Sequence, residues 1–262
     1  EDHYKVIGVK LSRRSFSVGV FDIGGNLYGV HSEKIDKDQE SNYTIGRIKS
    51  TIDEYIERFD NIVVIGIAVP GPYQKPQGKI ALITEMNNWL DVPLKDKFDN
   101  IYDIPIVIEH DANAGALAEW WFSTQSKFVN GTLVHFLVGE GVGAGVLVNG
   151  NIFYGNQGIA GEIGHISVDV NGAKCRCGNY GCLEMYCSSI AFVKHAKAML
   201  KEHKDSILNK NYKLTEDDIF NAAKMNDSLA IELIKKAGRY IGYGVVNIVN
   251  AYDPNVIVIS NS

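Results

Sequence analysis

All four cysteines of the chain lie within thirteen residues, from Cys175 to Cys187. His165 stands ten residues before the first of them, and Glu162 and Glu184 lie close by in the sequence. Cysteines that only pack a core have no reason to cluster in this way. Thiolates bind zinc tightly, so the spacing predicts a loop folded around a metal ion.

The favoured ligands are one imidazole and three thiolates: His165, Cys175, Cys177 and Cys182. Gly178 and Gly181 lie among the thiolates and let a short backbone fold back on itself. The residues alone leave two alternatives open. Cys187 can replace the histidine in an all-cysteine site, or the cysteines can form two disulfides or stay inert. Disulfides are rare inside cells, where the other features place this chain.

Composition and charge argue against two classes of protein. The chain has 262 residues, 45% hydrophobic and 22% charged, which suits one large domain or two modest ones. No run approaches eighteen apolar residues, and the first residues lack the pattern of a secretion signal, so we expect a cytoplasmic protein without a membrane span. The net charge of −5 and the pI near 5.8 oppose binding of a nucleic-acid backbone by this segment.

Strands and helices are expected to alternate along the first half. Apolar runs separated by turn residues predict the strands, and a three-to-four-residue apolar spacing predicts the first helix. The expected elements are a hairpin within residues 4–31 with a third strand at Leu27–His31, a helix at Tyr43–Phe59, strands at Ile62–Gly71 and Ile104–Glu109, and an alanine-rich helix after Asp111.

The second half begins again with strands and ends in helices and a last strand. We expect a strand pair within residues 131–155, helices at Ser188–Leu200, Thr215–Met225 and Ser228–Asn250, and a strand at Asn255–Ser260. Alternation of this kind predicts an α/β fold. The repeat of the pattern predicts a duplicated architecture, with one half at 1–111, a second half at 112–262 that contains the metal loop at 165–187, and a cleft between them.

Six stretches of the chain resemble the ROK family, a group of bacterial sugar repressors and sugar kinases. They are IGIAVPGP (65–72), NWLDVPL (88–94), IEHDANAGALAE (108–119), GEGVGAGVLVNGNIFYGNQGIAGEIGH (139–165), CRCGNYGCLE (175–184) and GYGVVNIVNAYDPNVIVIS (242–260). The cysteine loop joined to GEIGH is highly specific, whereas the glycine hairpin alone is a weak signal. The resemblance implies the actin-like ATPase fold, which is ribonuclease H-like.

In that family the histidine of GEIGH and the three cysteines of the loop hold a structural zinc ion. The resemblance therefore favours His165 over Cys187 as the fourth ligand and leaves Cys187 an unassigned thiol. An imidazole has two nitrogens, so one can bind the metal while the other forms a hydrogen bond with a sugar hydroxyl.

The resemblance also implies a sugar pocket, in which carboxylates accept hydrogen bonds from adjacent hydroxyls. Its expected members are Asn88, His110, Asp111, Glu162, His165 and Glu184. Asn88 is a looser candidate because its stretch departs from the family's usual Pro-Asn-Leu-x-x-Trp. His110 stands where most members have asparagine.

Each of these residues also has an ordinary structural explanation. Asp111 can cap the helix that begins at Ala112, since aspartate is favoured there. Glu162 and Glu184 can be solvated surface residues. The three tryptophans are expected to pack in the core rather than against a sugar ring: Trp89, Trp120 and Trp121.

Kinases of the family carry Asp-x-Gly-Gly-Thr after their opening Ile-Gly-x. Aligned on Ile7-Gly8-Val9, this chain has Lys10-Leu11-Ser12-Arg13-Arg14 instead. Lysine replaces the aspartate that orders magnesium, and side chains replace the glycines that let backbone approach phosphate. The second phosphate loop is kept in vestigial form at Gly139, Gly141 and Gly143. We therefore do not expect ATP or magnesium to bind.

These features predict a sugar-sensing transcriptional regulator, represented by its effector-binding and dimerisation region. Zinc is the expected cofactor, and the expected partners are a sugar effector and a second copy of the chain. DNA is expected to be contacted only through a winged helix-turn-helix upstream of this sequence. One alternative is an ATP-dependent hexose kinase with an atypical first loop, in which Asp111 is the catalytic base. Another is a scaffold that binds no sugar.

Overall fold

The computed structural model describes residues 3–36, 38–81, 86–122, 130–210 and 213–261. The chain divides into two compact units: Glu1–Trp121 with Ile152–Ala160, and Phe122–Asn151 with Gly161–Ser262. This division differs from the expected boundary after residue 111 in two ways. The helix that starts there stays with the first unit, and the chain enters that unit once more at residues 152–160.

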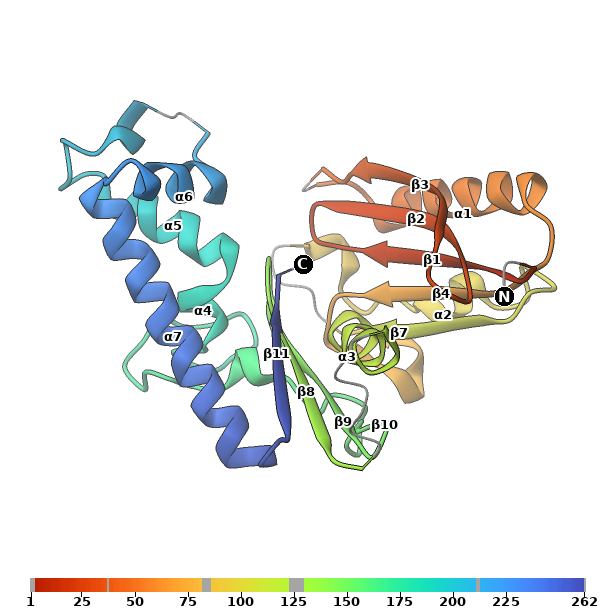
Figure 1. The fold of residues 1–262 in the computed structure, drawn as a ribbon. Coiled ribbons are helices and arrows are strands. Elements are labelled where there is room, and N and C mark those ends of the chain that lie inside the picture. The colour runs from red at the N-terminus through yellow and green to blue at the C-terminus, as the bar shows by residue number, and fades with distance from the viewer. Residues whose placement is uncertain (1–2, 37, 82–85, 123–129, 211–212, 262) are drawn as a thin grey trace. The chain divides into compact units, whose positions relative to one another are not determined.

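A five-stranded sheet with the order β3-β2-β1-β4-β7 forms the centre of the first unit (Figure 1). The first three strands are antiparallel neighbours, and β4 and β7 join them in parallel pairing. The bounds are β1 Lys5–Leu11, β2 Ser15–Asp22, β3 Leu27–Lys34, β4 Ile62–Val69 and β7 Ile106–His110, with a separate small hairpin of β5 Tyr73–Gln74 and β6 Lys79–Ile80.

The helices of this unit are α1 Ser41–Arg58, α2 Leu94–Phe98 and α3 Asp111–Phe122, with 3₁₀ turns η1 Lys75–Gln77 and η2 Asn87–Trp89. α1 packs on β1 and β2 through apolar residues three or four positions apart, among them Ile45, Ile48 and Ile52. This spacing is the one that predicted the helix.

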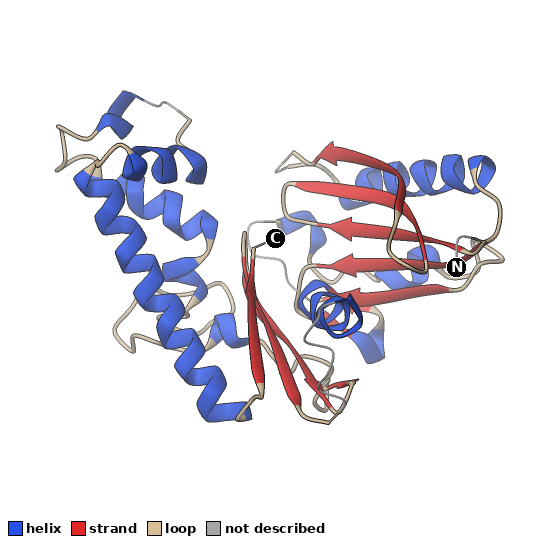
Figure 2. Ribbon diagram, in the orientation of Figure 1, coloured by secondary structure: helices blue, strands red, loops and turns tan. Residues whose placement is uncertain are grey.

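The second unit contains a four-stranded sheet with the order β10-β9-β8-β11. Its strands are β8 Thr132–Val138, β9 Val142–Val148, β10 Asn151–Ile152 and β11 Val256–Ser260. Its helical segments are η3 Ile163–His165, α4 Glu184–Cys187, α5 Ser189–Met199, η4 Ile207–Lys210, α6 Glu216–Lys224 and α7 Ser228–Tyr252. One end of α7 packs with α5 and α6, and its other end covers the sheet (Figure 2).

The two sheets share a pairing pattern. β2 runs antiparallel to β1 while β4 joins the other edge of β1 in parallel, and β9 and β11 are related to β8 in the same way. A parallel neighbour requires a crossover connection, and each crossover here contains helix. The duplicated α/β architecture predicted from the sequence is therefore present.

The tryptophans differ in burial. Trp89 is 1% exposed and lies in the core of the first unit, as predicted, and Trp120 is half-buried. The prediction for Trp121 is wrong, because this side chain is 74% exposed. The inner face of α3 follows the four-residue step from Ala112 through Ala116 to Trp120, and residue 121 falls outside that face.

No helix within the described ranges combines the length and the apolar character needed to cross a bilayer.

Candidate functional site

The loop between η3 and α4 brings together the four side chains that were expected to bind zinc. The donor atoms of His165, Cys175, Cys177 and Cys182 all lie within 4.8 Å of one another. The Cys177 and Cys182 sulfurs are 3.6 Å apart, and the Cys175 sulfur is 3.8 Å from His165 Nδ1. All four cysteines of the chain are free thiols, so the disulfide alternative is not realised.

These separations fit a tetrahedral zinc ion. With zinc–sulfur bonds of about 2.3 Å, neighbouring ligand atoms of a tetrahedron lie about 3.8 Å apart. Three thiolates and one imidazole are also a ligand type that zinc prefers. Burial raises the pKa of Cys175 and of Cys182, so a metal that binds them as thiolates displaces protons.

Close backbone contacts give the loop its shape. Isolated bridges join Ser167 to Cys182 and Lys174 to Tyr180. Gly181 has a φ of +60°, and a Cβ atom there would lie 1.8 Å from the carbonyl oxygen of Asp169. Only glycine fits this position, which turns the chain so that Cys182 faces the other donors.

Cys187 lies outside the donor cluster. It is buried in α4, its thiol donates to the carbonyl of Leu183 at 3.5 Å, and burial raises its pKa to about 12. Its sulfur is not among the four donor atoms that lie within 4.8 Å of one another. The geometry therefore favours His165 as the fourth donor.

The His165 ring has a different neighbour on each nitrogen. Nδ1 faces the thiols, while Nε2 lies 3.9 Å from a carboxylate oxygen of Glu162. Gly164 allows this segment to lie against β9, since a Cβ atom there would meet the carbonyl oxygen of Val142 at 2.0 Å. A metal on Nδ1 would leave Nε2 directed toward Glu162 and available to a polar ligand.

Glu184 is not a solvated surface residue. It is 4% exposed at the start of α4, and its Oε2 accepts the backbone N–H of Val142 at 3.0 Å. Val142 is the first residue of β9, directly after the glycine turn. Glu184 therefore ties the start of α4 to the start of β9.

The glycines of the expected vestigial phosphate loop also form contacts within the second unit. The N–H of Gly139 donates to the carbonyl of Gly141 at 2.9 Å, and the carbonyl of Gly139 accepts the N–H of Ser189. Gly143 lies within β9, opposite Leu137 of β8. These contacts close the turn and tie it to α5.

In the first unit, His110 ends β7 and Asp111 begins α3. The Nε2 atom of His110 lies 3.1 Å from Asp111 Oδ1, and the same oxygen accepts the backbone N–H of Ala112 at 2.8 Å. The Asp111 carboxylate therefore contacts the backbone of the first turn of α3. Asn88 donates to the carbonyls of Asp38 and Gln39 at 3.1 and 3.3 Å and so holds that loop.

A tight turn between β1 and β2 occupies the position where the related kinases carry their first phosphate loop. The N–H of Ser12 donates to the carbonyl of Ser15 at 2.8 Å, and Lys10 is exposed at the end of β1. This turn offers no carboxylate, because residues 10–14 are Lys, Leu, Ser, Arg and Arg.

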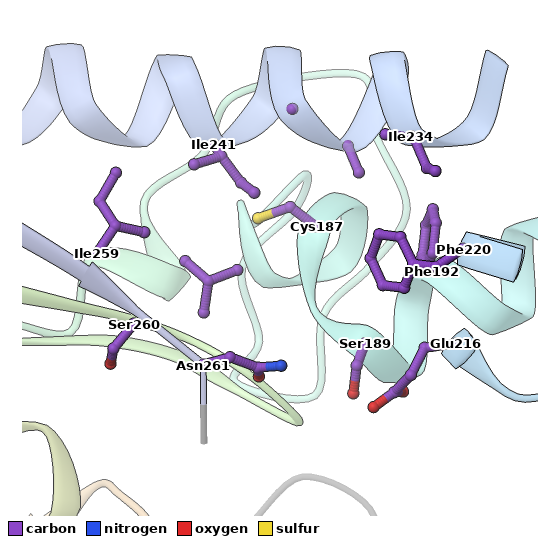
Figure 3. Close-up of a pocket in the computed structure, with 13 residues that line it drawn as sticks. Cys187, Ser189, Phe192, Glu216, Phe220, Ile234, Ile241, Ile259, Ser260 and Asn261 are labelled. Atoms are coloured by element: carbon purple, nitrogen blue, oxygen red, sulfur yellow. The ribbon is translucent and has the colours of Figure 1, made fainter. Parts of the chain in front are cut away.

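A cavity of about 380 Å³ in the second unit is distinct from the metal cluster. Apolar side chains dominate its lining, including Phe192, Ile234 and Ile241, and polar groups such as Ser189 and Glu216 lie along one side (Figure 3). A lining of this kind suits an apolar group better than a polyol.

One polar cluster was missed by the sequence analysis. Lys75, Glu109 and Tyr154 are hydrogen-bonded to one another inside the first unit. Their only sequence signal is the position of Glu109 directly before His110. Nothing in the pattern of the chain pairs residue 75 with residue 154.

Comparison with known proteins identifies both repressors and kinases as relatives. The ROK family matches residues 6–262. A xylose repressor of Bacillus subtilis (strain 168) is 38% identical over 201 residues, which are 77% of this chain and 48% of the repressor. A glucokinase of Halalkalibacterium halodurans is 37% identical over 204 residues, which are 76% of this chain and 61% of the kinase.

The fold has a close counterpart among solved structures. A ROK family transcriptional regulator, described as a homologue of the E. coli Mlc protein, superposes with a TM-score of 0.83 at 27% identity, covering 98% of this chain and 65% of the regulator. The expected α/β fold of actin-like ATPase type is confirmed. The chain spans about half to three-fifths of the length of the curated relatives it matches.

Proposed function

The chain belongs to the ROK family, and from that premise we propose that it is the effector-binding region of a sugar-responsive transcriptional regulator with a structural zinc ion. Its relatives include repressors and kinases, so the choice between sensor and enzyme depends on this chain's own residues.

The turn between β1 and β2 carries the proposal. Kinases that this chain resembles hold an aspartate and two glycines there, whereas Lys10, Ser12 and Arg13 occupy the aligned positions. Magnesium needs oxygen ligands, and the turn supplies a cation instead. This turn therefore opposes the binding of a magnesium–nucleotide complex.

The sugar-binding residues assigned by this proposal are the six that the family resemblance implies: Asn88, His110, Asp111, Glu162, His165 and Glu184. Carboxylates and imidazoles suit a polyol because each can bond more than one hydroxyl. Zinc, when bound, supplies a fixed charge that orders the loop and the orientation of His165. Bound sugar then stabilises one conformation of the protein over another.

In this proposal the chain binds its sugar effector without phosphorylating it. The conformational change passes to a DNA-binding domain, and a homodimer matches the two-fold symmetry of typical operators. The DNA-binding domain and the second copy of the chain are proposed for the whole protein.

Calorimetry on the zinc-loaded protein tests the proposal. Glucose, xylose and N-acetylglucosamine are titrated separately, followed by Mg-ATP. The expected result is heat of binding for at least one sugar and none for Mg-ATP. Binding of Mg-ATP together with a sugar would contradict the proposal.

A sugar kinase is the second candidate. The glucokinase relative and the retained Asp111, at the carboxyl end of β7, favour it. In a kinase Asp111 would take the proton from the attacking hydroxyl. That function requires ADP release when sugar and Mg-ATP are both present.

A further inference from the structure

The segment Ile152–Ala160, here named the strap, belongs to the first unit, although residues on both sides of it belong to the second. Tyr154 anchors the strap through its hydroxyl, which donates to Glu109 Oε2 at 2.8 Å. Lys75 Nζ donates to the same oxygen at 2.7 Å and also bonds the Tyr154 hydroxyl. Its ammonium lies 4.1 Å from the centre of the tyrosine ring, close enough for a cation–π contact.

The second oxygen of the Glu109 carboxylate organises the start of α3. Oε1 accepts the backbone N–H of His110 and the side-chain amide of Asn113, both at 3.0 Å. Glu109 is only 8% exposed and receives four hydrogen bonds in all. A buried carboxylate with this many donors holds its neighbours in one geometry. In the sequence, Asp111 lies between His110 and Asn113, which both donate to the Glu109 carboxylate.

The strap touches the first unit at a second point. Gly158 has a φ of +78°, and a Cβ atom there would lie 3.3 Å from the backbone nitrogen of Lys75. Within the strap, the N–H of Ala160 donates to the carbonyl of Tyr154 at 3.1 Å. The strap is therefore folded on itself and held at both its beginning and its end.

Glu109 and the strap both lie next to assigned sugar-binding residues in the sequence. Glu109 is followed directly by His110 and Asp111, and the strap is followed directly by Gly161 and Glu162. Glu109 is thus covalently adjacent to His110 and Asp111, and the strap that Tyr154 anchors leads within two residues to Glu162. Neither Lys75 nor Tyr154 is itself among the assigned sugar-binding residues.

We propose that Lys75, Glu109 and Tyr154 are positioning residues for the effector: the network fixes the strap to the end of β7 and so sets the placement of the sugar-binding residues that follow each. The inference rests on the proposed function. It predicts that loosening the network weakens sugar binding without removing any group that touches the sugar.

Tyr154→Phe and Lys75→Met test this inference in the zinc-loaded full chain. Tyr154→Phe keeps the ring and removes one donor from a buried carboxylate, so we expect sugar affinity to fall about tenfold. Lys75→Met is expected to have at least the same effect, and Lys75→Arg, which keeps the cation, to restore most of the affinity. The matched control is Lys79→Met, since Lys79 pairs with the exposed Asp91 at 2.8 Å in the same unit.

The readouts are the dissociation constants for glucose, xylose and N-acetylglucosamine, the melting temperature, and hydrogen exchange of the strap. Faster exchange in the strap of Tyr154→Phe, with reduced affinity and an unchanged melting temperature, supports positioning. Unchanged affinity beside faster exchange overturns it, because the strap would then be loose without consequence for the sugar. A wild-type protein that binds none of these sugars overturns the proposed function, and this role with it.

Discussion

His165 offers its two nitrogens to different neighbours, the thiols on Nδ1 and Glu162 on Nε2. One ring therefore connects the candidate zinc site to the candidate sugar site. An imidazole is suited to this because metal binding at one nitrogen fixes the protonation of the other.

The zinc site predicts a linked loss of metal and stability. Cys177→Ser removes one of three thiolates, so the zinc content should fall from about one ion per chain to a small fraction, and the melting temperature by about 5 °C or more. Metal analysis and thermal unfolding measure the two effects. Cys187→Ala is the control, because Cys187 lies outside the donor cluster. Full zinc content in Cys177→Ser would contradict the ligand set.

Asp111 is predicted to serve both the helix and the sugar. Asp111→Asn keeps a residue that is equally good at a helix start, so the melting temperature should change little. The lost charge should lower sugar affinity about tenfold or more. Calorimetry beside the control Asp91→Asn checks this. Undiminished affinity would remove Asp111 from the assigned residues.

Sequence reasoning found the residues whose partners are near in the chain. The four candidate zinc ligands lie within eighteen consecutive positions, from His165 to Cys182, and binding of a metal would explain their residue types. Glu109 was missed because its partners Lys75 and Tyr154 are 34 and 45 positions away. Only the packed fold brings such groups together.

At the scale of elements, the Glu109 carboxylate joins β7, α3 and the strap. Burial opposes its ionisation, but the hydrogen bonds that it accepts, chiefly from Lys75 and Asn113, hold the pKa of Glu109 below the ordinary value of 4.5. A carboxyl with a lower pKa in the folded state stabilises the fold above its unfolded pKa and loses that effect as pH falls through the folded value.

The first unit should therefore lose stability as the pH falls below about 4.5. Urea unfolding between pH 3 and pH 6 measures the effect. Glu109→Gln should be less stable at pH 6 and show a shallower decline toward pH 3. Parallel pH profiles for the two proteins would show that Glu109 makes no such contribution.

Long elements with a regular apolar spacing were predicted to within a few residues. α1 was expected at residues 43–59 and lies at Ser41–Arg58, and the last strand was expected at 255–260 and lies at Val256–Ser260. β5, β6 and the 3₁₀ turns were not predicted, because two or three residues carry no periodic pattern. The exposed Trp121 shows the same limit, since α3 is apolar on nearly every side and its sequence does not mark the inner face.

At the scale of the molecule, one pairing pattern occurs twice. The duplication could be predicted because each half was expected to begin with a strand hairpin and to end with a strand and a helix. The strap could not, since no local feature marks nine residues as belonging to the other unit. A single boundary in the sequence therefore assigns both α3 and the strap to the wrong unit.

We propose that this ROK chain senses a sugar and does not phosphorylate it. ADP release, measured on the zinc-loaded protein with Mg-ATP and each of glucose, xylose and N-acetylglucosamine, tests that claim most directly. We predict no release above the sugar-free background, even for a sugar whose binding is detected by calorimetry. Sugar-dependent turnover above about 1 per second would contradict it and make the chain a kinase.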